Sequence, residues 1–246
     1  MSGLRIVFFG TPEFAVPGLQ ALAQAPGIEL AAVVTRPDRA RGRGQERMEP
    51  PPVAAAARAL GLPVLQPDRP SRPGFAEELA ALRPDALAVV AYGHLIPDAM
   101  LSLARHGAWN VHPSLLPRWR GPAPIHRAIS SGDERTGVCI IKLVTEMDAG
   151  PVAMRSEISL TTTVTRGDLE GTLAALGADL LVRTLDRVQH GFVVDWVDVG
   201  LGSLRFWTFN LGDAAIDIGI LLLIVLALWP GLGGTRRDSG GTGHDA

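Results

Sequence analysis

The sequence predicts an α/β fold built on a doubly wound, mostly parallel sheet, and three observations support this. Short apolar runs typical of buried strands alternate with Ala- and Leu-rich stretches of helical periodicity. Gly and Pro residues separate the two kinds of segment, as turns require. The chain has 246 residues, enough for one large or two small domains. Strands that alternate with helices favour parallel pairing, because each helix returns the chain to the same end of the sheet.

The first half of the chain contains apolar runs that we expect to be strands, at Leu4–Phe9, Glu29–Thr35 and Ala86–Ala91. A helical pattern follows the first strand as far as Ala23, with Thr11 as its expected N-terminal cap and Pro12 near its first turn. The segment Arg36–Pro52 is dense in Arg, Gly and Pro and is expected to be a loop. Further helices are expected at Val53–Leu60, Phe75–Leu82 and Pro97–Leu103.

The second half continues the alternation and then breaks it. Strands are expected at Ala108–His112, Gly137–Leu143 and Val152–Ile158, and helices at Ala123–Ser131 and Asp168–Val188. Beyond a boundary near Asp186 to Gln189 come a strand-like run, an aromatic run and an apolar run of twelve residues, at Gly191–Trp196, Phe206–Asn210 and Ile218–Trp229. We therefore expect an α/β domain over residues 1–188, a separate fragment with an apolar helix over 189–230, and a disordered tail over 231–246.

Composition bears on the kinds of partner the protein can bind and on the cellular compartment in which it works. The formal net charge of −2 does not by itself indicate a nucleic-acid partner. Cys139 is the single cysteine, which excludes an intramolecular disulfide and is typical of a reducing compartment. The apolar run at the N-terminus is too short for a signal peptide, so we expect a cytoplasmic protein. The sequence contains no cluster of His, Cys and carboxylate residues of the kind that predicts a metal site.

Asn110 and His112 end a predicted strand and project to the same side of it, because successive side chains alternate in direction. Open α/β sheets place their active sites at such strand ends. Asp148 lies in a turn between two later strands. An amide can stabilise an oxyanion, an imidazole can move or lend a proton, and a carboxylate can set the charge and orientation of the imidazole. The three residues therefore suit acyl transfer to an amine.

Residues 110–129, NVHPSLLPRWRGPAPIHRAI, resemble the signature of the folate-dependent formyltransferases, and Asp148 stands where that family has its catalytic aspartate. The resemblance implies a Rossmann-like formyltransferase fold with Asn110, His112 and Asp148 as the catalytic residues. It also implies 10-formyltetrahydrofolate as the formyl donor and no metal.

Three further segments resemble the methionyl-tRNA formyltransferases. Phe9–Pro17 is similar to their opening, and no Gly-rich phosphate loop of the glycinamide ribonucleotide enzymes stands there. Thr35–Arg39 with Gly42–Gly44 is similar to their tRNA-contacting loop, and 90–97 to their pterin loop. The resemblance implies initiator methionyl-tRNA as acceptor, with tRNA contacts at Arg36, Arg39, Arg41 and Arg43. It implies folate contacts at Ala91, Tyr92, Gly93, His94, Leu95, Ile96, Ser114, Leu115 and Pro117. A sugar-nucleotide amine remains an alternative acceptor.

Residues 186–228 are similar to another family, signal peptidase II, whose catalytic aspartates match Asp195 and Asp213. Ile218–Trp229 matches its last membrane helix, yet twelve helical residues span about 18 Å of a hydrocarbon core about 30 Å thick. We expect vestigial aspartates and at most a weak, peripheral membrane association. A membrane-associated remnant without transferase activity is the alternative. Methionyl-tRNA formyltransferases normally continue into a C-terminal barrel that grips tRNA; we expect none here, with impaired activity as a consequence.

Overall fold

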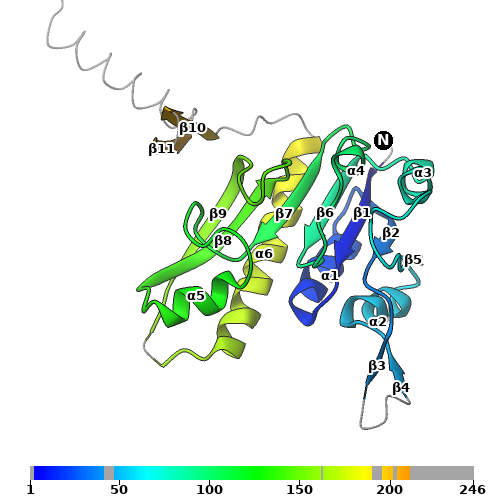
Figure 1. Cartoon of the computed structure of the whole chain (residues 1–246), viewed down its shortest axis with the longest axis horizontal. Coiled ribbons are helices and arrows are strands. Elements are labelled where there is room, and N and C mark those ends of the chain that lie inside the picture. Colours follow the sequence, from blue (N-terminus) through cyan, green and yellow to red (C-terminus); the bar gives the residue numbers. More distant parts are fainter. Residues whose placement is uncertain (1–2, 42–46, 162, 190–195, 202–203, 211–246) are drawn as a thin grey trace, which may run out of the picture. The chain divides into compact units, whose positions relative to one another are not determined.

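The structure is a computed structural model that describes residues 3–41, 47–161, 163–189, 196–201 and 204–210 (Figure 1). It divides into two compact units, Met1–Val194 and Asp195–Ala246. The described part of the larger unit contains a seven-stranded sheet in the order β5-β2-β1-β6-β7-β8-β9. In that order the strands are Val64–Leu65, Ile28–Val34, Leu4–Gly10, Ala86–Val90, Ala108–His112, Arg135–Lys142 and Val152–Ser159.

The sheet is mostly parallel, which confirms the predicted fold class. The pairs from β5 through to β7 are all parallel, and only β7 with β8 and β8 with β9 are antiparallel within this sheet. The chain winds outward from β1 to β2 and β5, then returns to the other side of β1 for β6 and β7. This reversal creates a topological switch point between β1 and β6, and ligands of open α/β sheets bind beyond the carboxyl ends of the strands at such a point.

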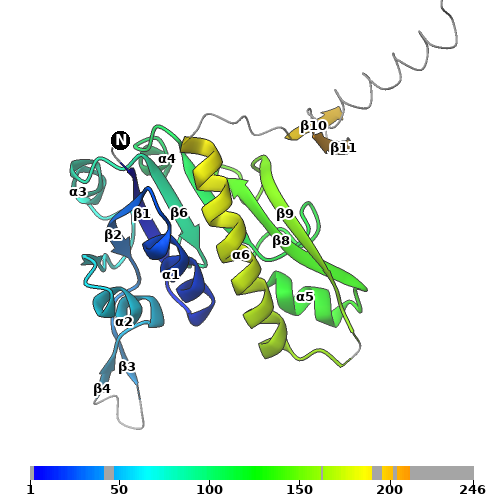
Figure 2. The same cartoon turned by 180° about the vertical axis from the view of Figure 1, so that it is seen from behind.

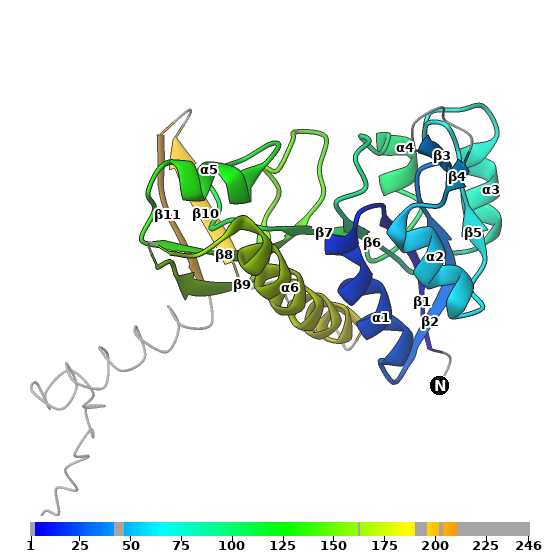
Figure 3. The ribbon, with the colours of Figure 1, turned by 90° about the horizontal axis from the view of Figure 1, so that it is seen from below.

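Helices cover both faces of the sheet because its strands carry apolar side chains on both faces. Ile6 and Phe8 of β1 belong to one buried cluster, to which α1 (Val16–Gln24), α2 (Pro52–Ala59) and α6 (Arg166–Gln189) contribute. Val7 and Phe9 face the opposite cluster, formed with α3 (Phe75–Ala81) and α4 (Asp98–Leu101). Figures 2 and 3 show α1 and α6 lying next to each other on the first face. α5 (Pro124–Ser130) follows the strand that carries the predicted site.

Two local predictions are wrong. The segment expected to be a loop contains a hairpin, β3 (Arg39–Arg41) and β4 (Arg47–Glu49), in which Ala40 pairs with Met48 (Figure 1). Three-residue strands are too short for their side chains to show a period in the sequence. Thr11 does not cap a helix: its hydroxyl donates to the carbonyl oxygen of Tyr92 at 2.9 Å, and a 3-10 turn, η1 (Glu13–Ala15), precedes α1.

The described part of the second unit is a single antiparallel pair, β10 (Trp196–Leu201) and β11 (Leu204–Asn210). The aromatic run at 206–210 lies within β11, whereas the strand-like run at 191–196 overlaps the described residues only at Trp196. Asp195, Asp213, Ile218–Trp229 and the tail at 231–246 lie outside the described residues. Among the helices that the structure describes, none combines the length and apolar character needed to cross a membrane. The domain boundary after residue 188 stays a prediction.

Candidate active site

Asn110 and His112 are brought to one cleft by β7. The strand lies between β6 and β8, with Asn110 opposite Val89 on one side and Ile141 on the other. Both predicted residues line a cleft of about 630 Å³. Segments that follow β1, β6 and β7 complete its walls, with Pro12, Glu13, Phe14, Ala91, Gly93 and residues 121–126. The cleft therefore lies at the switch point of the sheet, and its size is typical of a small-molecule site.

His112 is held between a backbone carbonyl and a carboxylate. Its side chain is almost fully buried, with Nε2 3.0 Å from the Trp119 carbonyl oxygen and Nδ1 3.5 Å from Asp148 Oδ2. A carbonyl oxygen can only accept, so Nε2 carries a hydrogen that it donates to Trp119. A hydrogen on Nδ1 would point at the carboxylate of Asp148. The arrangement can hold a proton at Nδ1 and release it again.

Asp148 reaches this site from the turn between β8 and β9. Its Oδ2 also accepts a hydrogen bond from the Gly121 backbone amide at 2.9 Å. The carboxylate thus links the imidazole to the segment that follows β7, and its side chain is only 13% exposed. The structure brings His112 and Asp148 into contact and places Asn110 on the same cleft. The catalytic roles of the three residues remain a prediction.

Strained backbone is concentrated around this cleft. Among the described residues, five that are not glycine have positive φ: Arg83, Ala91, Trp119, Ala123 and Asp148. Ala91 and Ala123 line the cleft, and Trp119 and Asp148 contact His112. Each such residue costs on the order of 1–3 kcal/mol, so the surrounding structure must impose it. Strain gathered in this way is characteristic of functional sites and supports the choice of this cleft.

Only part of the predicted folate set lines the cleft. Ala91 and Gly93 do so, since both follow β6. The Tyr92 ring is instead buried against Phe9 and His94, with ring centroids 5.3 and 5.6 Å apart, and its burial raises the pKa of the phenol to about 12. Ser114 is buried and donates to the Arg118 carbonyl oxygen. The remaining predicted folate residues do not line the cleft: His94, Leu95, Ile96, Leu115 and Pro117.

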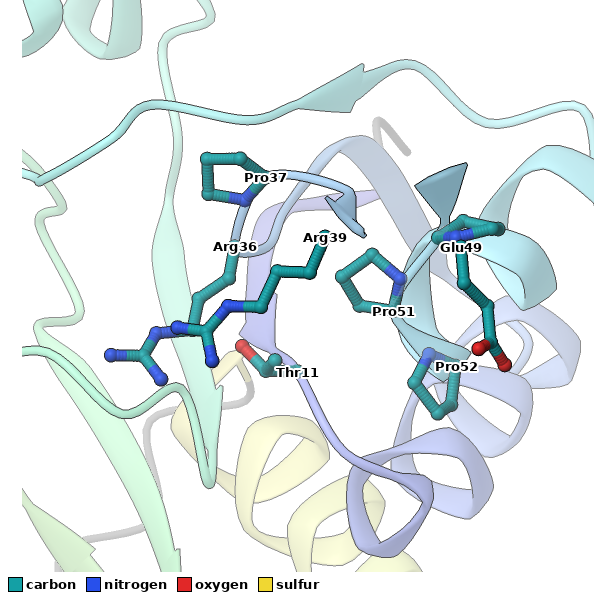
Figure 4. A pocket seen from close by; sticks show the side chains of 8 residues that line it. Thr11, Arg36, Pro37, Arg39, Glu49, Pro51 and Pro52 are labelled. Carbon is teal, nitrogen blue, oxygen red and sulfur yellow. The ribbon is translucent and has the colours of Figure 1, made fainter. Parts of the chain in front are cut away.

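A second, smaller cavity of about 190 Å³ adjoins the base of the β3–β4 hairpin. Its lining includes Thr11, Arg36 and Arg39, and Figure 4 shows the two arginine side chains running in the same direction past Thr11. Arg36 Nε donates to His94 Nε2 at 3.2 Å. Partial burial, and then the charges of Arg36 and Arg39, lower the pKa of His94. The guanidinium groups of Arg36 and Arg39 therefore both act on His94.

The nearest acidic residue in the sequence does not cancel this charge. Asp38 instead accepts a hydrogen bond from Gln66 at 2.6 Å and pairs with Arg58 at 3.5 Å. Glu49, which pairs with Arg39 across the hairpin, is the acidic residue that lines the cavity with the two arginines. The side chain of Arg41 and the whole of Arg43, which completed the predicted tRNA set, lie outside the described residues.

Sequence reasoning missed several groups at the cleft. Arg166 and Glu170 of α6 line it and form an ion pair at 2.8 Å, although they are far from Asn110 in the sequence. The Trp119 carbonyl and the Gly121 amide are backbone groups, which no residue pattern reveals. Arg118 follows β7, and Asp133 binds its guanidinium through two hydrogen bonds.

Solved structures resemble the fold of this chain. Glycinamide ribonucleotide transformylase 1 from Symbiobacterium toebii superposes with a TM-score of 0.65 at 23% identity, over 81% of this chain and 92% of that one. Phosphoribosylglycinamide formyltransferase from Bacillus halodurans gives 0.61 at 24% identity, over 75% and 94%. At these identities the likeness establishes the Rossmann-like formyltransferase fold alone.

Curated relatives are more similar in sequence. Methionyl-tRNA formyltransferase from Xylella fastidiosa (strain M23) is 49% identical over 188 residues, which are 76% of this chain and 60% of that protein. The Nitrobacter winogradskyi protein of the same name is 48% identical over 76% of this chain and 59% of its own length. The chain therefore spans about three-fifths of the length of these relatives.

Two family models match the sequence. Signal peptidase (SPase) II matches residues 165–229, which confirms the second resemblance and extends it back from residue 186 to residue 165, just before α6. Formyl transferase matches residues 4–185, which cover the whole sheet and nearly all of α6. This second match spans most of the sequence and includes Asn110, His112 and Asp148. The chain belongs to the formyl transferase family.

Proposed function

We propose that this chain transfers the formyl group of 10-formyltetrahydrofolate to the amine of methionine carried by initiator tRNA. The observation that carries the proposal is the contact between His112 and Asp148 beside Asn110, at the switch-point cleft of a formyl transferase fold. The names of the similar curated proteins support the choice of acceptor. We further propose that the reaction takes place in the cytoplasm, where charged initiator tRNA is used.

The residues of the cleft suit each stage of acyl transfer. The acceptor nitrogen attacks the formyl carbon, a new C–N bond forms, and the carbonyl oxygen gains negative charge. In this proposal the Asn110 amide and the His112 imidazole stabilise that oxygen, and His112 exchanges its hydrogen bond with the Trp119 carbonyl for one with the substrate to do so. Asp148 orients the imidazole, and the pair can relay the proton that the attacking amine loses to the departing folate nitrogen. The nitrogen–formyl bond of the donor breaks as that proton arrives.

The cleft also suits the donor by size and by its backbone. A volume of about 630 Å³ lies within the range of small-molecule sites. Ala91 and Gly93 present backbone at the cleft wall, and backbone groups can read the hydrogen-bonding edge of a flat heterocycle. No group of three or more His, Cys, Asp or Glu side chains suited to a metal occurs among the described residues.

Arg36 and Arg39 are proposed to bind the tRNA backbone. A Cβ added at Gly93 would lie 3.6 Å from the Arg36 guanidinium, so the positive groups adjoin the wall of the reaction cleft. Guanidinium groups bind phosphate oxygens through paired hydrogen bonds. A tRNA that brings the amine of the methionine at its 3′ end to Asn110 and His112 would therefore pass these arginines.

The test of this proposal is a formyl-transfer assay on the full chain with three acceptors: initiator methionyl-tRNA, glycinamide ribonucleotide and an amino-sugar nucleotide. The proposal expects the highest kcat/KM with methionyl-tRNA. A preference for either small acceptor would overturn it and, for the sugar nucleotide, establish the alternative function. No observation on the described residues favours a peptidase, because Asp195 and Asp213 lie outside them.

Arginine variants test the tRNA contact separately. Arg36→Ala and Arg39→Ala should raise KM for tRNA about tenfold, leave KM for folate within twofold, and lower the salt dependence of tRNA binding. Arg135→Ala is the matched control, because Arg135 forms an exposed ion pair with Glu157 away from the cleft. An equal rise in both KM values would mean that the arginines hold the fold and not the tRNA.

A further inference from the structure

The segment between β7 and α5 supplies both backbone groups that orient the predicted acid–base pair. The Trp119 carbonyl accepts from His112, and the Gly121 amide donates to Asp148. These two groups are only two residues apart along the chain. A rotation of this short segment would therefore disturb the imidazole and the carboxylate together.

Trp119 holds its position in an unfavourable backbone conformation. Its φ is 62°, in the left-handed region that a bulky side chain rarely adopts. A conformation of this kind persists only when contacts elsewhere in the fold impose it. The question is which contacts fix Trp119, since its carbonyl direction depends on them.

Asp133, just after α5, binds the side chains of both Trp119 and Arg118. Its Oδ2 accepts from the Trp119 indole Nε1 at 2.7 Å and from Arg118 Nε at 3.0 Å, and its Oδ1 accepts from the other end of the guanidinium. The guanidinium also stacks over the Trp119 ring, with its central carbon 4.6 Å from the ring centroid. The Asp133 side chain is 9% exposed, although that of Arg118 is 60% exposed.

A further hydrogen bond, from Ser114, holds the backbone of the segment that contains Arg118 and Trp119. The buried Ser114 hydroxyl donates to the Arg118 carbonyl oxygen at 2.7 Å. The hydrogen bonds from Arg118 are the largest influence on the pKa of Asp133 and lower it; burial opposes them, and the hydrogen bond from Trp119 lowers the pKa further, so the carboxylate stays charged. The backbone at Arg118 and both neighbouring side chains are therefore held at once.

We propose that Asp133 is a positioning residue for formyl transfer: it fixes Trp119 and Arg118 so that the backbone of 119–121 orients His112 and Asp148. The inference rests on the proposed function. Asp133 touches neither of the two catalytic candidates in any described contact, so it acts through the Trp119 carbonyl and the Gly121 amide. At metal sites, groups that orient the ligands from outside change affinity or activity by about 10–100-fold when they are lost, and we expect an effect of similar size here.

Three variants separate the contacts. Asp133→Ala removes every hydrogen bond that Asp133 accepts from Trp119 and Arg118. It should lower kcat about tenfold or more, with KM for both substrates within about twofold. Trp119→Phe removes only the indole donor and should give part of this loss. Asp133→Asn keeps an acceptor for the indole but loses the charge for Arg118, so its kcat should lie between those of Asp133→Ala and the wild type. The pH profile of kcat should change in Asp133→Ala, since the orientation of a proton-carrying group has changed.

Histidine ¹⁵N NMR provides a readout that needs no turnover. The His112 signals, assigned by their loss in His112→Ala, should move in Asp133→Ala and in Trp119→Phe. They should stay in place in the control Glu157→Ala, which breaks an exposed ion pair on β8 and β9. Unmoved His112 signals in a folded Asp133→Ala protein would overturn the proposal. Moved signals in a chain that transfers no formyl group would overturn the proposed function and leave the positioning role intact.

A double-mutant cycle distinguishes positioning from general stabilisation. If Asp133 acts through His112, adding Asp133→Ala to His112→Ala should cause little additional loss of kcat. An equal fold-loss in both backgrounds, or a lowered Tm with unchanged kcat and pH profile, would show that Asp133 only stabilises the fold.

Discussion

Asp148 Oδ2 lies 3.5 Å from His112 Nδ1, although the two residues are 36 positions apart in the sequence. His112 closes β7, whereas Asp148 belongs to the turn after β8. β8 runs antiparallel to β7 and ends with Lys142 opposite Trp109, so the segment after β8 returns toward the carboxyl end of β7 for Asp148 to reach His112. The same carboxylate oxygen accepts from Gly121, so its position is fixed from two directions.

The charge of Asp148 should be essential to turnover. Asp148→Asn keeps a carbonyl oxygen for the Gly121 amide but can no longer stabilise a charged His112. We expect kcat to fall by at least about 10²-fold while Tm changes little, in line with the loss of one electrostatic group from an acyl-transfer site. Steady-state kinetics and a thermal melt check this. A kcat within threefold of the wild type would remove Asp148 from the mechanism.

Gly150 should be required for the turn that carries Asp148. A Cβ at this position would lie 1.7 Å from the carbonyl oxygen of Lys142, a backbone atom that cannot move without shifting β8. Gly150→Ala should therefore displace the turn, lower kcat and destabilise the fold by about 1–3 kcal/mol. Gly171→Ala is the matched control, because a Cβ there meets nothing within 4 Å. Equal behaviour of the two variants in kinetics and urea unfolding would contradict this account of the turn.

Cys139 should make the protein less stable in alkali. Burial raises the pKa of its thiol to about 11 from an ordinary 9.0. The folded state then holds this proton more tightly than the unfolded state, so the contribution to stability is complete below pH 9 and is lost between about pH 9 and 11. Two pH units correspond to about 3 kcal/mol at most.

Urea unfolding at pH 7, 9 and 10.5 measures this effect, with Cys139→Ala as the comparison. The free energy of unfolding should fall with pH more steeply in the wild type than in Cys139→Ala. The folded wild type should also resist thiol reagents at pH 8, because the side chain is completely buried. Parallel pH profiles for the two proteins would show that the thiol has no such role.

The α/β unit should fold without the second unit. α6 closes its core with buried residues such as Leu173 and Leu181, and the compact unit ends at Val194. A chain that ends at Val194 should keep its Tm and its stabilisation by folate, whereas one that ends at Arg166 should not fold. Thermal melts with and without folate distinguish the outcomes. Loss of folding in the longer truncation would mean that the later residues belong to the core.

Most of the fold, and the presence of Asn110 and His112 on one cleft, could be predicted from the sequence for identifiable reasons. Buried strands such as Ala86–Val90 have continuous apolar runs, and the Asn-x-His spacing directly predicts which side chains share a face. The β3–β4 hairpin and β5 were missed because two or three residues show no period. Asp133 and Trp119 were missed because their contribution depends on a left-handed backbone and on contacts between distant loops.

The predicted folate set shows the same limit. Tyr92 and Gly93 are neighbours in the sequence, yet Tyr92 is directed into the core and Gly93 lines the cleft. A linear motif names a segment but does not say which of its side chains face the ligand. Alternation along β7 resolves this for Asn110 and His112, whereas the irregular segment after β6 has no such rule.

Single-turnover formation of formyl-methionyl-tRNA by the wild type and by Asn110→Ala tests the central claim most directly. Full-length protein in excess over charged initiator tRNA, with saturating 10-formyltetrahydrofolate, isolates the transfer step from product release. The account predicts transfer by the wild type, a rate lower by at least about 10²-fold in Asn110→Ala, and an unchanged Tm. Equal rates in the two proteins, or transfer by neither protein although both are folded, would contradict it.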